Sequence, residues 1–153
     1  MNQVSLKFNF QWDAPEEGEE YWSVIAQIWQ TTTYPNSSIV LLIGQDGNVG
    51  LGYSSPWGDN NSRITSNDPT LVSGHEYQFR IVAGVDYAWV VLQDLTAETP
   101  AAVIYKWKTP GMDYPVPYVE FHYNSGNETY GRFGYKNVEM WAKTRLDWLP
   151  AGA

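Results

Sequence analysis

Short runs of apolar and aromatic residues alternate with turn-forming residues along the whole chain. No window keeps apolar residues at the spacing i, i+3, i+4, i+7 over three turns, which is the pattern of an amphipathic helix. The runs instead have the length and the Val, Ile, Tyr and Trp content of β-strands. We expect strands at residues 3–12, 22–31, 38–44, 48–53, 75–84, 86–95, 101–108, 116–123 and 131–143.

Turn signals divide these strands at roughly 8–12 residue intervals, the spacing of an antiparallel sandwich or barrel. The clearest signal is Asp46-Gly47, between IVLLIG and NVGLGY, because Asp-Gly is favoured in two-residue hairpin turns. The sequence contains no internal repeat, no low-complexity tract and no long linker. It therefore predicts a single all-β domain over residues 1–153, an antiparallel β-sandwich with little or no helix.

Alternation along two strands separates an apolar face from a mixed one, because neighbouring side chains in a strand point to opposite sides. On residues 22–29, the expected core face carries Val24, Ala26 and Ile28, and the opposite face carries Ser23, Ile25, Gln27 and Trp29. On residues 118–123, the expected core face carries Val119, Phe121 and Tyr123, and the opposite face carries Tyr118, Glu120 and His122. Rings, an amide, a carboxylate and an imidazole together suit a sugar-binding groove.

Composition narrows the classes of partner. Aromatic residues make up 16% of the chain, charged residues only 17%, and the formal net charge is -8 at pH 7. Nucleic-acid binding requires a basic surface that displaces counterions, so this balance argues against a nucleic-acid partner, and equally against anionic lipid. The longest apolar run, Ile39 to Ile43, is far shorter than the ~20 residues that span a bilayer. We expect no membrane partner.

Four segments carry a resemblance to a known superfamily: SVIAQIWQ, GHEYQFRIVAG, YVEFHYNSG and GYKNVEMWA. Their order resembles that of concanavalin-like jelly rolls, and is most similar to the polysaccharide-lyase branch, whose last strand often ends in a pattern matched here by Tyr135-Lys136-Asn137-Val138. The resemblance implies a concanavalin-like jelly-roll fold. Two departures bear on activity: Gln27-Ile28-Trp29 stands where the lyases have Gln-Ile-His, and the arginine that neutralises the substrate carboxylate has no counterpart. Lyase chemistry needs a base and a group that stabilises the enolate. Because the two departures leave this set of groups incomplete, we interpret the chain as a binding protein.

The sequence thus predicts a lectin-like domain that binds a carbohydrate, a polysaccharide in particular, without cleaving it. We expect the groove to be lined by Gln27, Trp29, Tyr118, Glu120 and His122, with Trp57 on a rim loop. The rings would stack on sugar faces, while Gln27 and Glu120 would orient hydroxyl groups.

Two further interpretations stay open. The first is a small polysaccharide-degrading enzyme, either a glycoside hydrolase that uses Glu120 and Glu139 or a lyase that uses His122 and Tyr118. The second is a structural or assembly domain, because low charge and many aromatic residues also suit a subunit interface, that of a homo-oligomer included.

No metal site and no cofactor are predicted. Asp46-Gly47-Asn48 and Asp59-Asn60-Asn61 offer oxygen ligands that suit calcium, but neither has the spacing of a dedicated calcium loop. Cysteine is absent, and the two histidines are too far apart in sequence to propose zinc. The first residues, MNQVSLKFNF, do not show the pattern of a signal peptide. The location is therefore left undecided between the cytoplasm and a mature secreted fragment, soluble in either case.

Overall fold

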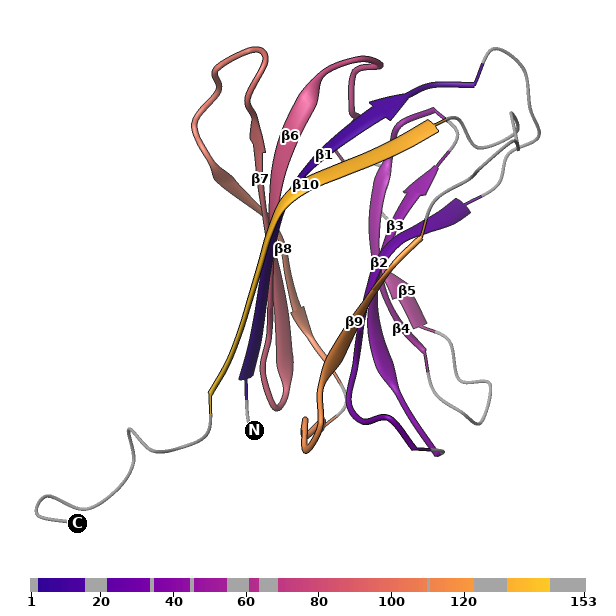
Figure 1. Cartoon of the computed structure of the whole chain (residues 1–153), viewed down its shortest axis with the longest axis vertical. Helices are drawn as coiled ribbons and strands as arrows, with labels where there is room; N and C mark the ends of the chain where they lie inside the picture. The colour runs from indigo at the N-terminus through magenta and orange to yellow at the C-terminus, as the bar shows by residue number, and fades with distance from the viewer. Residues whose placement is uncertain are drawn as a thin grey trace, which may run out of the picture.

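The strands form two antiparallel sheets that face each other across the molecule (Figure 1). The computed structural model describes residues 3–15, 22–33, 35–44, 46–54, 61–63, 69–109, 111–122 and 132–143. Within these residues there is no helix, in agreement with the missing helical periodicity. It follows that none of the described elements is an apolar helix of membrane-spanning length.

Each sheet contains five strands. Sheet A contains β10 (Arg132–Lys143), β1 (Gln3–Asp13), β6 (Glu76–Ala83), β7 (Tyr87–Asp94) and β8 (Ala102–Lys108), in that order across the sheet. Sheet B contains β5 (Asn61–Arg63), β4 (Val49–Ser54), β3 (Ser38–Gly44), β2 (Trp22–Trp29) and β9 (Tyr118–Phe121). The nine expected strands are confirmed. The sequence did not predict β5, because three polar residues carry no apolar alternation.

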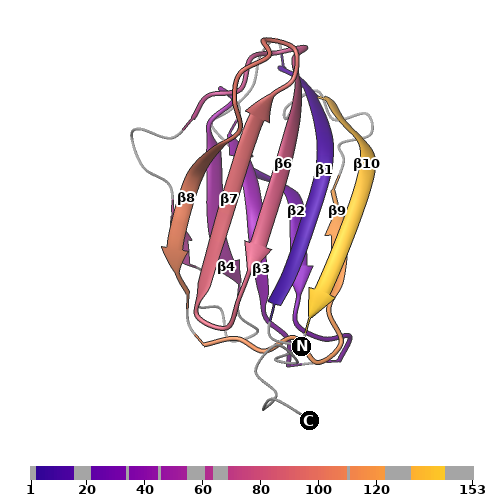
Figure 2. The same ribbon diagram turned by 90° about the vertical axis from the view of Figure 1, so that its left-hand side faces the viewer.

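The chain passes several times between the sheets. It begins in sheet A with β1, forms β2 to β5 in sheet B, returns to sheet A for β6 to β8, and adds β9 to sheet B before β10 closes sheet A. Figure 2 shows sheet A face on, with β1 between β6 and β10. This crossing pattern separates β9 from β10, which are neighbours in the sequence but belong to different sheets.

Alternating side chains build the core between the sheets. On β1 the buried apolar residues are Val4, Leu6, Phe8, Phe10 and Trp12, while the residues between them, apart from the buried Asn9, are partly exposed or exposed. Burial of a large apolar side chain contributes about 1.5–3 kcal/mol, so this strand alone supplies much of the driving force. The Phe8 ring meets the Phe121 ring of sheet B edge to face, with 5.2 Å between the centroids, and so joins the two layers.

A β-bulge in β2 corrects one expectation of the sequence. Strict alternation placed Ile25 on the outer face with Gln27 and Trp29, but the register with β3 shifts between Val24 and Ala26. The extra residue turns Ile25 inward, where it is fully buried in the core. Its carbonyl accepts a hydrogen bond from the backbone N–H of His122, 3.0 Å away. A bulge leaves one residue outside the ladder, and here the residue that follows β9 supplies a partner for its carbonyl.

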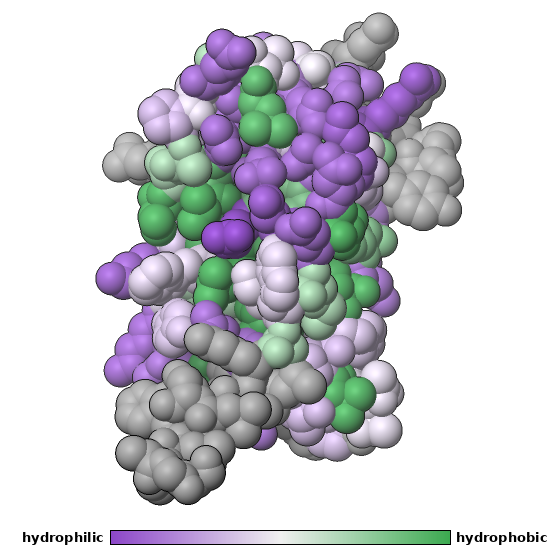
Figure 3. Space-filling view, turned by 60° about the vertical axis from the view of Figure 1, so that its left-hand side comes forward, coloured by the Kyte–Doolittle hydropathy of each residue, from purple (hydrophilic) through white to green (hydrophobic). Residues whose placement is uncertain are grey.

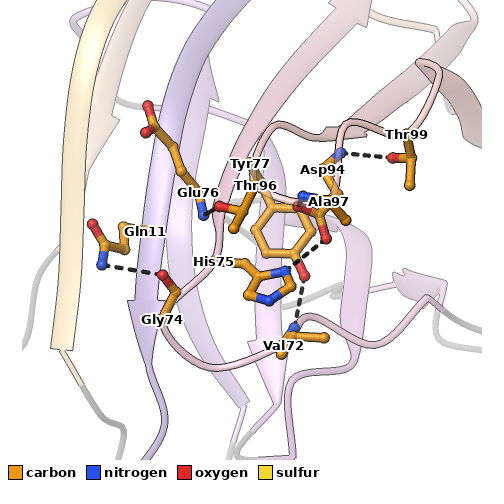
Figure 4. A network of polar contacts seen from close by, with 10 residues as sticks. All are labelled: Gln11, Val72, Gly74, His75, Glu76, Tyr77, Asp94, Thr96, Ala97 and Thr99. Atoms are coloured by element: carbon orange, nitrogen blue, oxygen red, sulfur yellow. Dashed lines mark hydrogen bonds and ion pairs between the residues drawn. The ribbon is translucent and has the colours of Figure 1, made fainter.

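A polar network holds the turns at one end of sheet A (Figure 4). The Nδ1 atom of His75 lies 2.9 Å from an Asp94 carboxylate oxygen, and the other oxygen accepts the Ala97 N–H at 2.9 Å. The Tyr77 hydroxyl accepts the N–H of Val72 at 2.7 Å. Burial acts to raise the pKa of Asp94, but the bonds from Ala97 and His75 outweigh it and leave that pKa below its ordinary value. The network therefore favours the ionised form of Asp94.

This lowered pKa predicts an acid-sensitive contribution to stability. The contribution is present above the unfolded-state pKa of Asp94 and is lost as pH falls through the lower folded-state pKa. We expect Asp94→Asn to destabilise the protein at pH 7 by about 0.5 kcal/mol, the scale of a partly exposed ion pair, and to unfold with less dependence on pH below about 4. Thermal melts from pH 7 to pH 3 would measure this. Glu98→Gln, at an exposed turn position, should keep the wild-type pH dependence, and parallel curves for all three proteins would contradict the prediction.

Candidate functional site

The outer face of sheet B brings together five of the six expected site residues. Strand β2 pairs with β9, and in this register Trp29 lies opposite Tyr118 while Gln27 lies opposite Glu120. Ala26 and Ile28 point into the core, so Gln27 between them and Trp29 after them face outward. The remaining expected residue, Trp57, lies outside the described residues.

Two aromatic rings form a stacked pair on this face. The rings of Trp29 and Tyr118 are nearly parallel, with 14° between their planes and 6.0 Å between their centroids. Both side chains are partly exposed. The indole Nε1–H of Trp29 is buried and has no hydrogen-bond partner in the part of the chain that the structure describes. A buried donor without a partner is uncommon, and because this atom is covered, it is the rings and not the N–H that are open to solvent on this face.

Polar side chains continue the face next to the rings. The amide of Gln27 is buried and donates a hydrogen bond to the Ser38 hydroxyl at 2.7 Å, which fixes its orientation. The Nε2 atom of His122 lies 3.1 Å from a carboxylate oxygen of Glu120, and the side chains are 40% and 48% exposed respectively. The site therefore combines one fixed amide with an accessible carboxylate and a half-exposed imidazole, whose Nε2 atom is itself buried beside Glu120.

A tyrosine of the other sheet anchors the end of β9. Tyr135, on β10, reaches across the core, and its hydroxyl lies 2.8 Å from the Ile25 carbonyl and also contacts the His122 carbonyl. Burial raises the pKa of Tyr135, so its hydroxyl keeps its proton and can donate. The position of His122 thus depends on both the β2 bulge and Tyr135.

Glu139 does not join the site. It lies on β10 in sheet A, where its carboxylate is 3.9 Å from the Lys7 ammonium group, whereas Glu120 lies on β9 in sheet B. The two strands do not pair with each other, although the proposed hydrolase with Glu120 and Glu139 required both carboxylates to open on one groove. Tyr118 and His122 do share the outer face with Glu120, as the alternation predicted.

No metal centre is formed by the described residues, which contain no group of three or more His, Asp and Glu side chains able to hold an ion. The Asp46 carboxylate instead accepts hydrogen bonds from the backbone and side-chain N–H groups of Asn48 within the turn. Asp59 and Asn60, the other candidate oxygen ligands, lie outside the described residues.

Comparison with known proteins identifies the architecture. No protein-family model and no curated protein matches the chain. Among solved structures, sheep galectin-11 superposes with a TM-score of 0.59 at 12% identity, covering 92% of this chain and 91% of the galectin. The fold is a concanavalin-like jelly roll. The jelly roll is also that of the alginate lyase from Klebsiella pneumoniae, with a TM-score of 0.58 at 13% identity over 94% of this chain and 61% of the lyase.

A third similar structure is the carbohydrate-binding module CBM66 from Bacillus subtilis, with a TM-score of 0.57 at 6% identity over 93% of this chain and 76% of the module. The likeness at these identities concerns the fold, because a pentraxin and a glutamic peptidase match the same jelly roll. Any function must therefore be argued from the side chains of this chain.

Sequence reasoning overlooked the outer face of sheet A. Two indoles, Trp89 and Trp141, are 37% and 48% exposed there, although aromatic residues on these strands were not singled out as candidate ligands. The signal was present in the alternation Tyr87-Ala88-Trp89-Val90, in which the small and branched residues are buried. It could have been found by sorting every strand into faces, as was done for residues 22–29 and 118–123.

Proposed function

We propose that the chain binds a neutral carbohydrate on the outer face of sheet B, without cleaving it. The observation that carries the proposal is the stacked pair of Trp29 and Tyr118, whose rings share a partly exposed face with the Glu120 carboxylate and the His122 imidazole. Rings next to polar groups are the arrangement that a sugar requires, because a pyranose has apolar C–H faces and hydroxyl edges.

Each group has a defined role in this proposal. The Trp29 and Tyr118 rings provide an apolar surface for a sugar ring. The Glu120 carboxylate accepts hydrogen bonds from hydroxyl groups, and the His122 imidazole can donate or accept. Gln27, already bonded to Ser38, keeps the neighbouring position rigid.

Charge favours a neutral ligand over an acidic one. Strands β2, β3, β4 and β9 contain no lysine or arginine, and Glu120 is their only charged residue. A uronate carboxylate would be repelled by Glu120 and would lack a cation on these strands. The same lack of a cation weighs against lyase chemistry, which must stabilise negative charge next to the substrate carboxylate.

The fold supports a carbohydrate ligand because galectin-11, a carbohydrate-binding module and an alginate lyase share it with this chain. This support is general, since the identities are low. The choice of the outer face of sheet B rests on the residues named above and not on the fold.

The test is a screen of neutral glycans on an array, followed by calorimetric titration of the best ligand. We expect Trp29→Ala and Tyr118→Ala each to weaken binding about tenfold or more, because each removes roughly half of the stacking surface. Trp89→Ala, which removes an indole from sheet A, is the matched control and should bind normally. Unchanged affinity in both sheet B variants, or equal loss in the control, would contradict the proposal.

A second candidate function is hydrolysis at Glu120. The observation that favours it is the register, which places the Gln27 amide directly opposite Glu120, with His122 beside the carboxylate. In such a site water would add to the anomeric carbon as the glycosidic C–O bond breaks, the Glu120 carboxyl group would protonate the leaving oxygen, and the His122 imidazole would take the proton of the attacking water. A product assay on the array ligand would detect turnover. Glu120→Gln should abolish it and Glu139→Gln, the same change on sheet A, should not, whereas no product from the wild type would exclude this candidate.

A further inference from the structure

The basic residues of this acidic protein gather on one sheet. Of its nine Lys and Arg residues, seven lie on strands of sheet A: Lys7, Arg80, Lys106, Lys108, Arg132, Lys136 and Lys143. The same strands contain four acidic residues, Asp13, Glu76, Asp94 and Glu139, so that they carry an excess of three positive charges. The whole chain carries a formal charge of -8. Sheet A is therefore a basic surface within an acidic protein.

Two cation–indole pairs lie on the outer face of this sheet. The Arg80 guanidinium lies over the Trp141 ring, 5.9 Å from its centroid, and the Lys106 ammonium lies over the Trp89 ring at 5.1 Å. Neither cation forms an ion pair with a described acidic side chain, whereas Lys136 lies 3.0 Å from Glu76. Each pair thus offers an aromatic surface together with a positive charge that is free to meet an anion.

The strand register places the two indoles in one row across the sheet. Trp141 lies opposite Ser5, Ser5 opposite Val82, and Val82 opposite Trp89. Three strand steps separate the indoles, a span of about 14 Å at the usual strand spacing. Between them are only a small hydroxyl and a branched apolar side chain. The row is therefore long enough for a chain of several sugars and is not blocked in its middle.

Depressions in the surface adjoin both ends of the row. One, of about 300 Å³, is lined by Ser5, Arg80 and Trp141 among others. The second, of about 440 Å³, is lined by Trp89 with two cations, Lys106 and Lys108, and one carboxylate, Asp86, among others. In Figure 3, where sheet A comes forward, hydrophobic residues form separate green patches among hydrophilic ones, as expected for a ligand-binding face and unlike a continuous apolar subunit interface.

We propose that the outer face of sheet A is a second carbohydrate site, which binds an acidic polysaccharide through Trp141 with Arg80 and Trp89 with Lys106. The anionic groups of the ligand meet the two cations and its sugar rings lie against the indoles. Charge complementarity selects a polyanion here, in contrast to the face of sheet B. The aromatic pairs favour a polysaccharide over a second copy of this chain. This site is independent of the proposed function, because the two faces point away from each other.

The experiment compares an oligogalacturonate with its carboxyl-reduced form, which keeps the sugar chain and removes the charge. Titrations at 20 and 200 mM NaCl would use the wild type and two double variants, Trp89→Ala with Trp141→Ala and Arg80→Gln with Lys106→Gln. We expect the acidic ligand to bind about tenfold more tightly than the reduced one, and each double variant to lose about tenfold, the scale of one to two cation–π contacts. Added salt should weaken wild-type binding most.

Two control variants make the result specific. Lys136→Gln lies on the same sheet but removes a cation already paired with Glu76, and Trp29→Ala removes the aromatic group of sheet B, so both should bind the acidic ligand normally. Loss of binding in Trp29→Ala would mean that the acidic ligand binds on sheet B. That result would overturn the proposed site on sheet A but not the proposed role of Trp29 and Tyr118. Because the neutral reduced form can bind at sheet B, the two ligand forms are also compared in Trp29→Ala, and equal affinity for them in that variant would overturn the proposal too. Equal affinity for a single-stranded oligonucleotide of the same charge would also contradict the proposal. The same holds if the wild type binds no ligand but forms dimers that the sheet A variants do not form.

Discussion

Replacing Gly47 by alanine should destabilise the protein by about 3 kcal/mol or more, the sum of a left-handed backbone penalty and an overpacked core. Gly47 has a φ of 91°, a conformation that an L-residue adopts at a cost. An added Cβ would lie 2.6 Å from the Leu71 carbonyl oxygen and 2.9 Å from the Trp12 ring. Leu71 cannot easily move, because its N–H donates to the Gly47 carbonyl at 2.8 Å.

Gly74 supplies the matched control for this prediction. Its φ of 82° is similar, but nothing lies within 4 Å of the position where a Cβ would be added. Gly74→Ala should therefore cost only the backbone penalty of about 1–2 kcal/mol. Urea unfolding followed by circular dichroism would give both free energies of unfolding. If the two variants lose the same stability, the close approach of Leu71 and Trp12 to the turn is not the reason that glycine is required at residue 47.

Tyr135→Phe should cost about 2 kcal/mol, because it removes a hydroxyl from two carbonyl groups and leaves the His122 carbonyl without this donor. The same variant should weaken carbohydrate binding on sheet B, since the Tyr135 hydroxyl holds His122, the residue that follows β9. The stability effect would be measured by urea unfolding and the binding effect by titration at a temperature where the variant is fully folded.

Tyr105→Phe separates the two effects. Tyr105 also reaches from sheet A to sheet B, where its hydroxyl donates to the Val49 carbonyl on β4, away from β9. We expect this variant to lose stability on a similar scale and to keep its affinity. An equal loss of affinity in both variants would mean that any loss of contact between the sheets disturbs the site, and that Tyr135 has no specific role in it.

The fold followed from the sequence because alternation and turn chemistry act locally. Asp46-Gly47 predicted the hairpin between β3 and β4, and the turn forms there, with the Gly47 N–H donating to the Gly44 carbonyl. The position of Ile25 did not follow, because a single extra residue in β2 reverses its side and leaves no mark in the composition of the strand. The groups that bond to the carbonyl of Ile25 belong to His122 and Tyr135, which are far from it in the sequence. No local pattern therefore reveals them.

The candidate site was predicted in part for the same reason. Alternation along one segment of chain is enough to predict which side chains share a face, as it did for Tyr118, Glu120 and His122. The neighbouring positions of Gln27 and Glu120 required the pairing of β2 with β9, which no local pattern reveals. The separation of Glu120 from Glu139 depended on the crossing of the chain between sheets, and adjacency in sequence suggested the opposite. Net charge was also misleading locally, because the total of -8 conceals the basic strands of sheet A.

The place of β1 inside sheet A, between β10 and β6, bears on how the protein is made. Phe10 of β1 pairs with Tyr77 on one side and with Tyr135 on the other, so both partners are synthesised long after it. Such non-local pairing predicts slow folding, in milliseconds to seconds. During synthesis β1, an apolar strand, has neither neighbour until β6 emerges, and one open edge until β10 follows. Open apolar edges pair readily with other chains. The nascent chain is therefore most exposed to aggregation through a strand that in the folded protein has a neighbour on both sides.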